Sequence, residues 1–73
     1  MNSSLFRVGE LVHVPASVHL LKLDPGYQQI TTESMLNPAP IVGVVMGIPN
    51  EKLLEVYCRG AKWSIPTRNI YKI

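Results

Sequence analysis

The fold is decided by residues 53–66, which read LLEVYCRGAKWSIP. Apolar residues recur at every second position on both sides of Arg59 and Gly60, and this pair suits a tight turn because glycine readily adopts a positive φ. In an extended chain, such alternation gives each strand one apolar face. The pattern therefore predicts a β-hairpin with one buried face. The residues expected on that face are Leu54, Val56, Cys58, Trp63 and Ile65.

Shorter apolar runs flank this hairpin. Residues 9–14 and 41–48 are predicted strands, and residues 70–73 form a short last strand after a single turn. Gly43 and Gly47 lie on the same face of the strand at 41–48, which predicts close backbone approach, a bend or a bulge there. The succession of short strands and Pro- or Gly-containing turns indicates an all-β domain.

A long segment, residues 15–39, separates the first two main strands. It holds an apolar piece at 18–23, a strong turn signal at 24–26 and then a polar stretch that could form one helical turn through Met35. We expect a long loop with a partly ordered hairpin. This loop either folds over the core to complete it or presents a contact surface.

Size and composition indicate one small domain. The chain has 73 residues, of which 47% are hydrophobic, enough for one folded core. We expect a flexible N-terminus at residues 1–6 and a single domain at residues 7–73. Cys58 is the only cysteine, so no disulfide can form within the chain, and this fits a reducing compartment.

No membrane or export signal is visible. The N-terminus has no apolar stretch resembling a signal peptide, and the longest apolar run, residues 40–48, is far shorter than a membrane span. We therefore expect a soluble protein that is cytoplasmic or that lies within a virion or another assembly, with no membrane partner.

No motif for catalysis, cofactor binding or metal binding is found. The glycines are spaced for strands and turns rather than for a phosphate-binding loop, and no nucleophile motif surrounds any serine. His13 and His19 lack the clustered ligands that zinc requires. We expect a non-enzymatic protein with no catalytic residues, no cofactor and no metal site.

The order of these elements resembles that of SH3-like barrels. The likeness rests on VGELV at residues 8–12, on IVGVV at 41–45, and on WSIP at 63–66 followed by Asn69 and Ile70. It implies a small five-stranded SH3-like barrel with a long loop between the first two main strands. The chain is similar to accessory barrels that act as docking subunits, and most of all to the compact barrel proteins encoded by tailed bacteriophages. The resemblance implies architecture rather than activity.

Protein contact is the first functional hypothesis. Alternation places Leu11, Leu53 and Tyr57 outward, and Tyr27 belongs to a loop richer in apolar residues than solvation requires. Covering such a surface would stabilise a small core. We therefore expect a docking or structural module that binds a protein partner or forms a homo-oligomer, such as a phage accessory or virion component.

The alternative is a nucleic-acid-binding barrel of the KOW kind. A net charge of +2 is too mild to indicate nucleic-acid binding by itself, but basic and aromatic residues cluster near the C-terminus. Such residues can contact phosphates and stack on bases. The candidate nucleic-acid contacts are Arg59, Lys62, Arg68, Tyr71 and Lys72.

Overall fold

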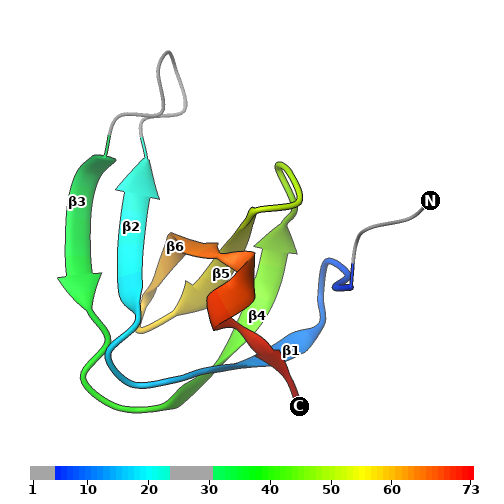
Figure 1. The fold of residues 1–73 in the computed structure, drawn as a ribbon, viewed down its shortest axis with the longest axis horizontal. Helices are drawn as coiled ribbons and strands as arrows, with labels where there is room; N and C mark the ends of the chain where they lie inside the picture. Colours follow the sequence, from blue (N-terminus) through cyan, green and yellow to red (C-terminus); the bar gives the residue numbers. More distant parts are fainter. Residues whose placement is uncertain (1–4, 24–30) are drawn as a thin grey trace.

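The structure, a computed structural model, describes residues 5–23 and 31–73, and this part of the chain is all-β, as predicted (Figure 1). Tyr27 and the turn expected at residues 24–26 lie outside the described residues. The elements are β1 (Leu11–Val14), β2 (His19–Leu23), β3 (Thr31–Leu36), β4 (Ile41–Gly47), β5 (Leu53–Cys58), β6 (Ala61–Pro66), the 3₁₀ turn η1 (Thr67–Asn69) and β7 (Tyr71–Lys72).

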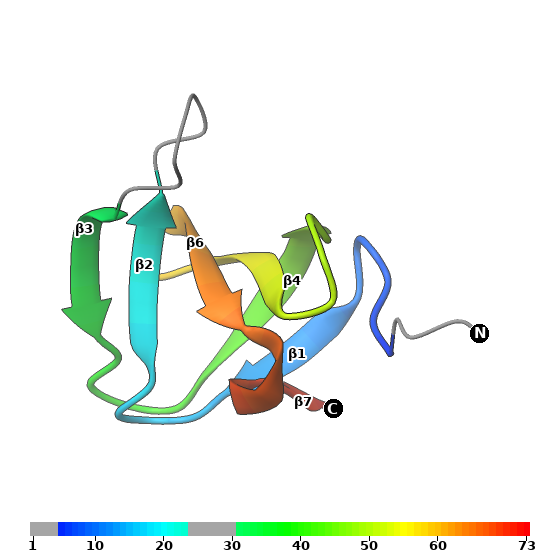
Figure 2. The ribbon, with the colours of Figure 1, turned by 45° about the horizontal axis from the view of Figure 1, so that its top comes forward.

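The strands form one antiparallel sheet in the order β3-β2-β6-β5-β4-β1-β7. Figures 1 and 2 show that this sheet is bent, with the β2–β3 hairpin on one side and β1 and β4 on the other. Its edges, β3 and β7, do not pair with each other in the described part, so the sheet is not closed. The prediction of a small five-stranded SH3-like barrel is therefore not confirmed, because the described sheet has seven strands and is open.

Two strands come from the segment that was expected to be a long loop. β2 and β3 pair with each other, with Leu20 opposite Met35, and β2 joins β6 where Leu21 lies opposite Ser64. The hairpin expected within this segment is therefore confirmed. The helical turn considered through Met35 does not form, because pairing with β2 supplies backbone hydrogen bonds that a single helical turn lacks. Leu20 is fully buried and Val18 and Met35 pack on the core, so this part of the segment completes the core.

The hairpin formed by β5 and β6 matches its prediction. Val56 lies opposite Trp63, which is 4% exposed and donates a hydrogen bond from Nε1 to the carbonyl oxygen of Cys58 at 3.1 Å. Arg59 and Gly60 both have positive φ, 50° and 78°, as a two-residue hairpin turn with primed geometry requires. The alternation in residues 53–66 therefore determines which side chains enter the core.

The core is a single cluster of buried apolar side chains. Phe6 belongs to it and is 6% exposed, so the packed residues begin one position before the predicted domain boundary at residue 7. An isolated aromatic residue in a short N-terminal segment gives no periodic signal, which is why the sequence did not reveal it. The cluster comprises Phe6, Val12, Val14, Leu20, Val45, Leu54, Val56, Cys58, Trp63, Ile65 and Ile70.

Asn37 is the buried polar residue of this part of the chain, at 1% exposed. Its Nδ2 donates to the carbonyl oxygens of Pro15 at 2.8 Å and Val14 at 3.3 Å, and its Oδ1 accepts a bond from Arg59 Nε at 2.7 Å. Its backbone also bonds to residues 17 and 18. Asn37 therefore joins the end of β1, the end of β3 and the turn between β5 and β6.

The glycines of β4 allow its close packing on β5. The pairing of the two strands shifts register between Val45 and Gly47, which confirms a bulge at the predicted place. A Cβ atom on Gly43 would lie 2.5 Å from Val56 Cγ1 and 3.1 Å from the Tyr57 carbonyl oxygen. Only hydrogen fits at Gly43, since both neighbours are held by the sheet.

We expect Gly43→Ala to lower the free energy of unfolding by about 1–3 kcal/mol, as overpacking of a core does. Gly47→Ala is the matched control, because its Cβ would meet the carboxylate end of the Glu55 side chain, which can move aside. Urea denaturation followed by circular dichroism measures both. Equal stability of the two variants would contradict the close approach at Gly43.

Candidate functional site

The outer face of the sheet carries the apolar side chains that were predicted to point outward. Residues opposite each other in antiparallel strands lie on the same face. Leu11 on β1 is opposite Val44 on β4, and Val44 is opposite Tyr57 on β5. Leu11 is 53% exposed and Tyr57 is 49% exposed, with the half-buried Val44 between them. The three residues form one apolar row across three neighbouring strands.

A second row lies beside the first. His13 on β1 is opposite Val42 on β4 and also opposite Tyr71 on β7. The rings of His13 and Tyr71 have centroids 6.5 Å apart and planes inclined by 50°. Val42 and Tyr71 are more than half exposed. We refer to the two rows together as the outer-face patch, which consists of Leu11, His13, Val42, Val44, Tyr57 and Tyr71.

One ion pair borders this patch, and a second lies on the opposite face of the sheet. Lys62, which lies opposite Tyr57, has its Nζ 3.6 Å from Glu55 Oε1. Lys72 lies opposite the buried Val12 and therefore on the inner face, with its Nζ over the Phe6 ring and 3.2 Å from Glu10 Oε2. The backbone N–H of Arg7 and then Lys72 lower the pKa of Glu10, so this carboxylate stays charged and available to Lys72. The lysine that borders the patch, Lys62, is thus already paired within the molecule.

No relative identifies the chain. Comparisons with protein families, curated proteins and solved structures find no match. Its function is therefore inferred from the chemistry of its surface.

The structure brings together two of the four residues predicted to contact a protein partner. Leu11 and Tyr57 share one row of the outer-face patch, whereas Leu53 lies away from them, opposite Pro66. Tyr27 lies outside the described residues. The sequence showed that Val42 and Val44 share a face, but it did not show that this is the outer one. A signal was present in Gly43, which has no side chain and lies against Val56 and Cys58 on the core face.

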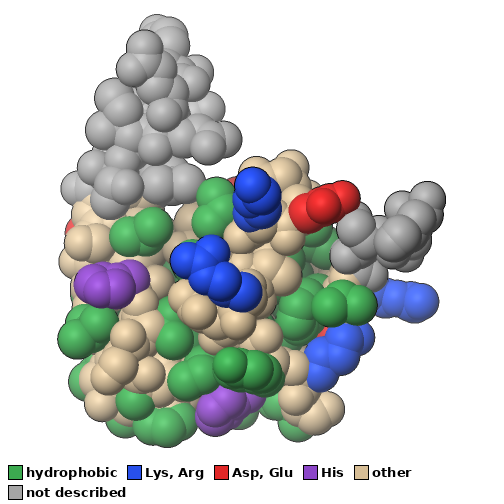
Figure 3. Space-filling model, in the orientation of Figure 1, with side chains coloured by type: hydrophobic (Ala, Val, Ile, Leu, Met, Phe, Trp, Pro, Cys, Tyr) green, Lys and Arg blue, Asp and Glu red, His purple; other side chains and the backbone are tan. Residues whose placement is uncertain are grey.

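The predicted nucleic-acid contacts are not brought into one patch. Arg59 holds two loops together, since it donates to Asn37 Oδ1 and, from Nη2, to the Ala39 carbonyl oxygen at 2.8 Å. Lys62 and Lys72 are paired with carboxylates. Figure 3 shows basic side chains scattered among hydrophobic and uncharged atoms on the face that it draws. Of the two remaining residues, Arg68 lies on η1 and Tyr71 lies in the outer-face patch.

Cys58 has the environment of a packed side chain. It is 3% exposed, and this burial raises the pKa of its thiol despite the opposing charge of Arg59. The thiol is therefore protonated at neutral pH. In residues 5–23 and 31–73, no group of three His, Cys, Asp or Glu side chains could hold a metal ion, and no helix has the length and apolarity to cross a membrane.

Proposed function

We propose that this protein is a non-enzymatic docking module that self-associates through the outer-face patch. The observation that carries the proposal is the exposed row formed by Leu11, Val44 and Tyr57. An exposed apolar row suits a surface where proteins meet, and tyrosine is enriched at such surfaces. A small domain also has a thin margin of stability, so covering the patch would add apolar burial that one copy cannot supply.

A second copy of this chain fits the patch in charge. Two patches related by a twofold axis would meet apolar row against apolar row. Like-charge repulsion between the copies is small because Lys62, the lysine that borders the patch, already has a carboxylate partner. The apolar row thus favours a self-complementary contact over a strongly charged partner.

We also propose that the bent sheet has the SH3-like arrangement. This is supported by the order of elements, in which a hairpin separates β1 from β4 and a 3₁₀ turn leads from β6 to β7. It is supported too by the place of β1 between β4 and β7. A small barrel with one docking face suits an accessory or structural component of a larger assembly, such as a phage particle.

Tyr57→Glu tests the proposed interface, because it replaces the aromatic side chain at one end of the apolar row with a charged one. We expect the wild type to form a dimer whose dissociation constant rises at least about 30-fold in this variant, as the loss of an interface hot spot does. Sedimentation velocity over a range of concentrations measures the change. Leu36→Glu is the matched control, since Leu36 is 52% exposed on β3 and outside the patch.

A wild type that stays monomeric at millimolar concentration would contradict the proposal. The same would follow if Leu36→Glu dissociated the dimer as strongly as Tyr57→Glu. Titration with single- and double-stranded oligonucleotides at several salt concentrations tests the alternative. Binding that weakens steeply with added salt would support nucleic-acid recognition instead.

A further inference from the structure

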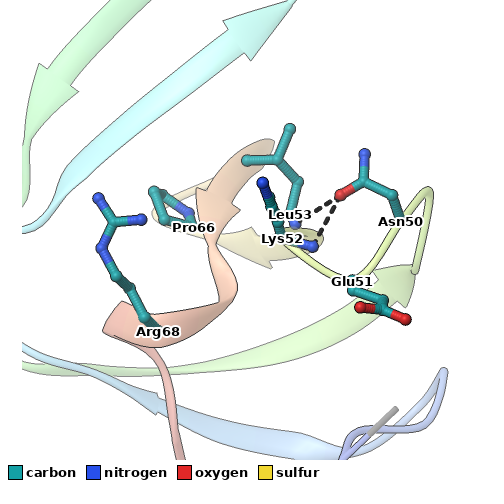
Figure 4. A pocket seen from close by; sticks show the side chains of 6 residues that line it. All are labelled: Asn50, Glu51, Lys52, Leu53, Pro66 and Arg68. Atoms are coloured by element: carbon teal, nitrogen blue, oxygen red, sulfur yellow. Dashed lines mark hydrogen bonds between the residues drawn. The ribbon is translucent and has the colours of Figure 1, made fainter. Parts of the chain in front are cut away.

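A shallow depression lies beside η1, away from the outer-face patch. It has a volume of about 590 Å³, and none of its lining residues belongs to that patch. The side chains come from the turn between β4 and β5, from the start of β5, from the end of β6 and from η1 (Figure 4). The lining residues are Asn50, Glu51, Lys52, Leu53, Pro66 and Arg68.

The floor of the depression is aliphatic. Leu53 and Pro66 lie opposite each other in the register of β5 and β6, and both are half-buried. In Figure 4, Pro66 lies between Arg68 on one side and Lys52 with Leu53 on the other. The floor can therefore accommodate one apolar side chain between two cationic ones.

The two cations at the rim are not neutralised by the molecule itself. Among the described residues, the ion pairs use Lys22, Lys62 and Lys72, whereas Lys52 and Arg68 enter none. Both are exposed. The depression thus differs from the rest of the basic surface, where lysines face carboxylates.

Hydrogen bonds fix the backbone on which this rim stands. Asn50 Oδ1 accepts bonds from the backbone N–H groups of Lys52 at 2.8 Å and Leu53 at 3.1 Å. The backbone N–H of Thr67 donates to the Lys52 carbonyl oxygen at 2.8 Å. The backbone of Lys52 is therefore hydrogen-bonded both to the turn before it and to the 3₁₀ turn that carries Arg68. These bonds fix the positions of the two backbone segments from which the cationic side chains extend.

The donors of the depression outnumber its acceptors. Asn50 uses its Oδ1 within the turn and leaves its Nδ2 as a further donor. The Glu51 carboxylate points away from the space between Lys52 and Arg68 (Figure 4). Ammonium, guanidinium and amide N–H groups around an aliphatic floor are complementary to carboxylates that flank an apolar side chain.

We infer that this depression binds an acidic peptide segment of a protein partner. One apolar side chain of the peptide rests on Leu53 and Pro66, and the flanking carboxylates pair with Lys52 and Arg68. A nucleic acid is less well matched, because the lining offers no aromatic ring on which a base could stack. The inference is independent of self-association, since the two surfaces share no residue.

The test uses a fluorescein-labelled peptide in which one Leu is flanked on both sides by Glu in a Gly-Ser background. We expect fluorescence anisotropy to show saturable binding that weakens with added salt. We also expect backbone amide shifts at Lys52, Leu53 and Arg68 in NMR spectra of the ¹⁵N-labelled protein. The matched peptides carry Gln in place of Glu or Ser in place of Leu, and both should bind more weakly.

Variants locate the site. Lys52→Gln and Arg68→Gln should each weaken peptide binding roughly three- to fivefold, the effect of one solvent-accessible charge pair, and Lys62→Gln should leave it unchanged. Thermal unfolding verifies that each exposed substitution leaves the fold intact. The inference is overturned if the peptide shifts no amides around the depression, if Lys62→Gln weakens binding as much as Arg68→Gln, or if a single-stranded oligonucleotide of equal charge binds at least as tightly.

Discussion

Trp63→Ala is expected to lower the free energy of unfolding by about 3–5 kcal/mol, the cost of removing a large aromatic side chain from a packed core. Trp63 is 4% exposed and lies opposite Val56 on the buried face. Lys22 Nζ covers its ring at 5.0 Å from the centroid. A domain of this size has a total stability of only about 4–11 kcal/mol, so this one substitution should leave a large fraction of the chain unfolded.

The measurement is urea denaturation followed by far-UV circular dichroism, because the variant has no tryptophan fluorescence. Trp63→Phe provides the control, since it keeps a buried ring but removes the N–H that bonds to the Cys58 carbonyl oxygen. We expect it to cost about 1–2 kcal/mol, less than the alanine variant. An unchanged unfolding midpoint for Trp63→Ala would show that the alternation in residues 53–66 does not organise the core.

Asn37→Ala should cost about 3 kcal/mol, because it leaves buried acceptors at the end of β1 without a donor. Asn37 is the residue through which β1, β3 and the turn between β5 and β6 are joined. Asn37→Asp separates the two parts of this role. The carboxylate keeps the acceptor for Arg59, but it cannot donate to the carbonyl oxygens of Val14 and Pro15.

Chemical denaturation of four proteins measures this effect: the wild type, Asn37→Ala, Asn37→Asp and Arg59→Ala. Arg59 is exposed at its guanidinium, so its truncation should cost only about 1 kcal/mol. The Asn37→Asp variant should be nearly as unstable as Asn37→Ala, since both lack the Nδ2 donor. If Asn37→Ala cost no more than Arg59→Ala, the buried amide would not hold the three segments together.

The part of the fold that the sequence predicts is the part determined by local patterns. Alternation and a turn pair define the hairpin of β5 and β6 because the pairing of its two strands lies entirely within residues 53–66. The same reasoning placed Leu11 and Tyr57 outward, and both are exposed. It did not orient β4, because the side chains on both faces of that strand are apolar or absent and alternation alone cannot choose between them.

What the sequence did not reveal depends on contacts between distant residues. Asn37 donates hydrogen bonds to Val14 and Pro15, which precede it by 23 and 22 positions in the sequence. Without these long-range partners, a stretch rich in Asn and Pro has the pattern of a simple loop. The polar residues of β3 hid a strand, because an edge strand needs only a few buried positions to pair. Lys72 is close in sequence to Arg68, yet it pairs with Glu10 from the other end of the chain.

The depression beside η1 has the same origin. Lys52 and Arg68 are far apart in sequence and have no motif in common. They are brought together because β5 pairs with β6 so that Leu53 lies opposite Pro66. The register of this hairpin could be predicted from the sequence, but both cations lie outside residues 53–66, Lys52 in the turn before β5 and Arg68 on η1, where no alternation marks them.

The most direct test of the proposed interface is an isotope-filtered NMR experiment on a sample that mixes ¹³C-labelled and unlabelled protein. Only contacts between two copies give signals in this measurement. We predict intermolecular nuclear Overhauser effects that join the Leu11 and Val44 methyl groups of one copy to the Tyr57 ring of another. Signals confined to residues outside the outer-face patch, or none at millimolar concentration, would contradict self-association through this face.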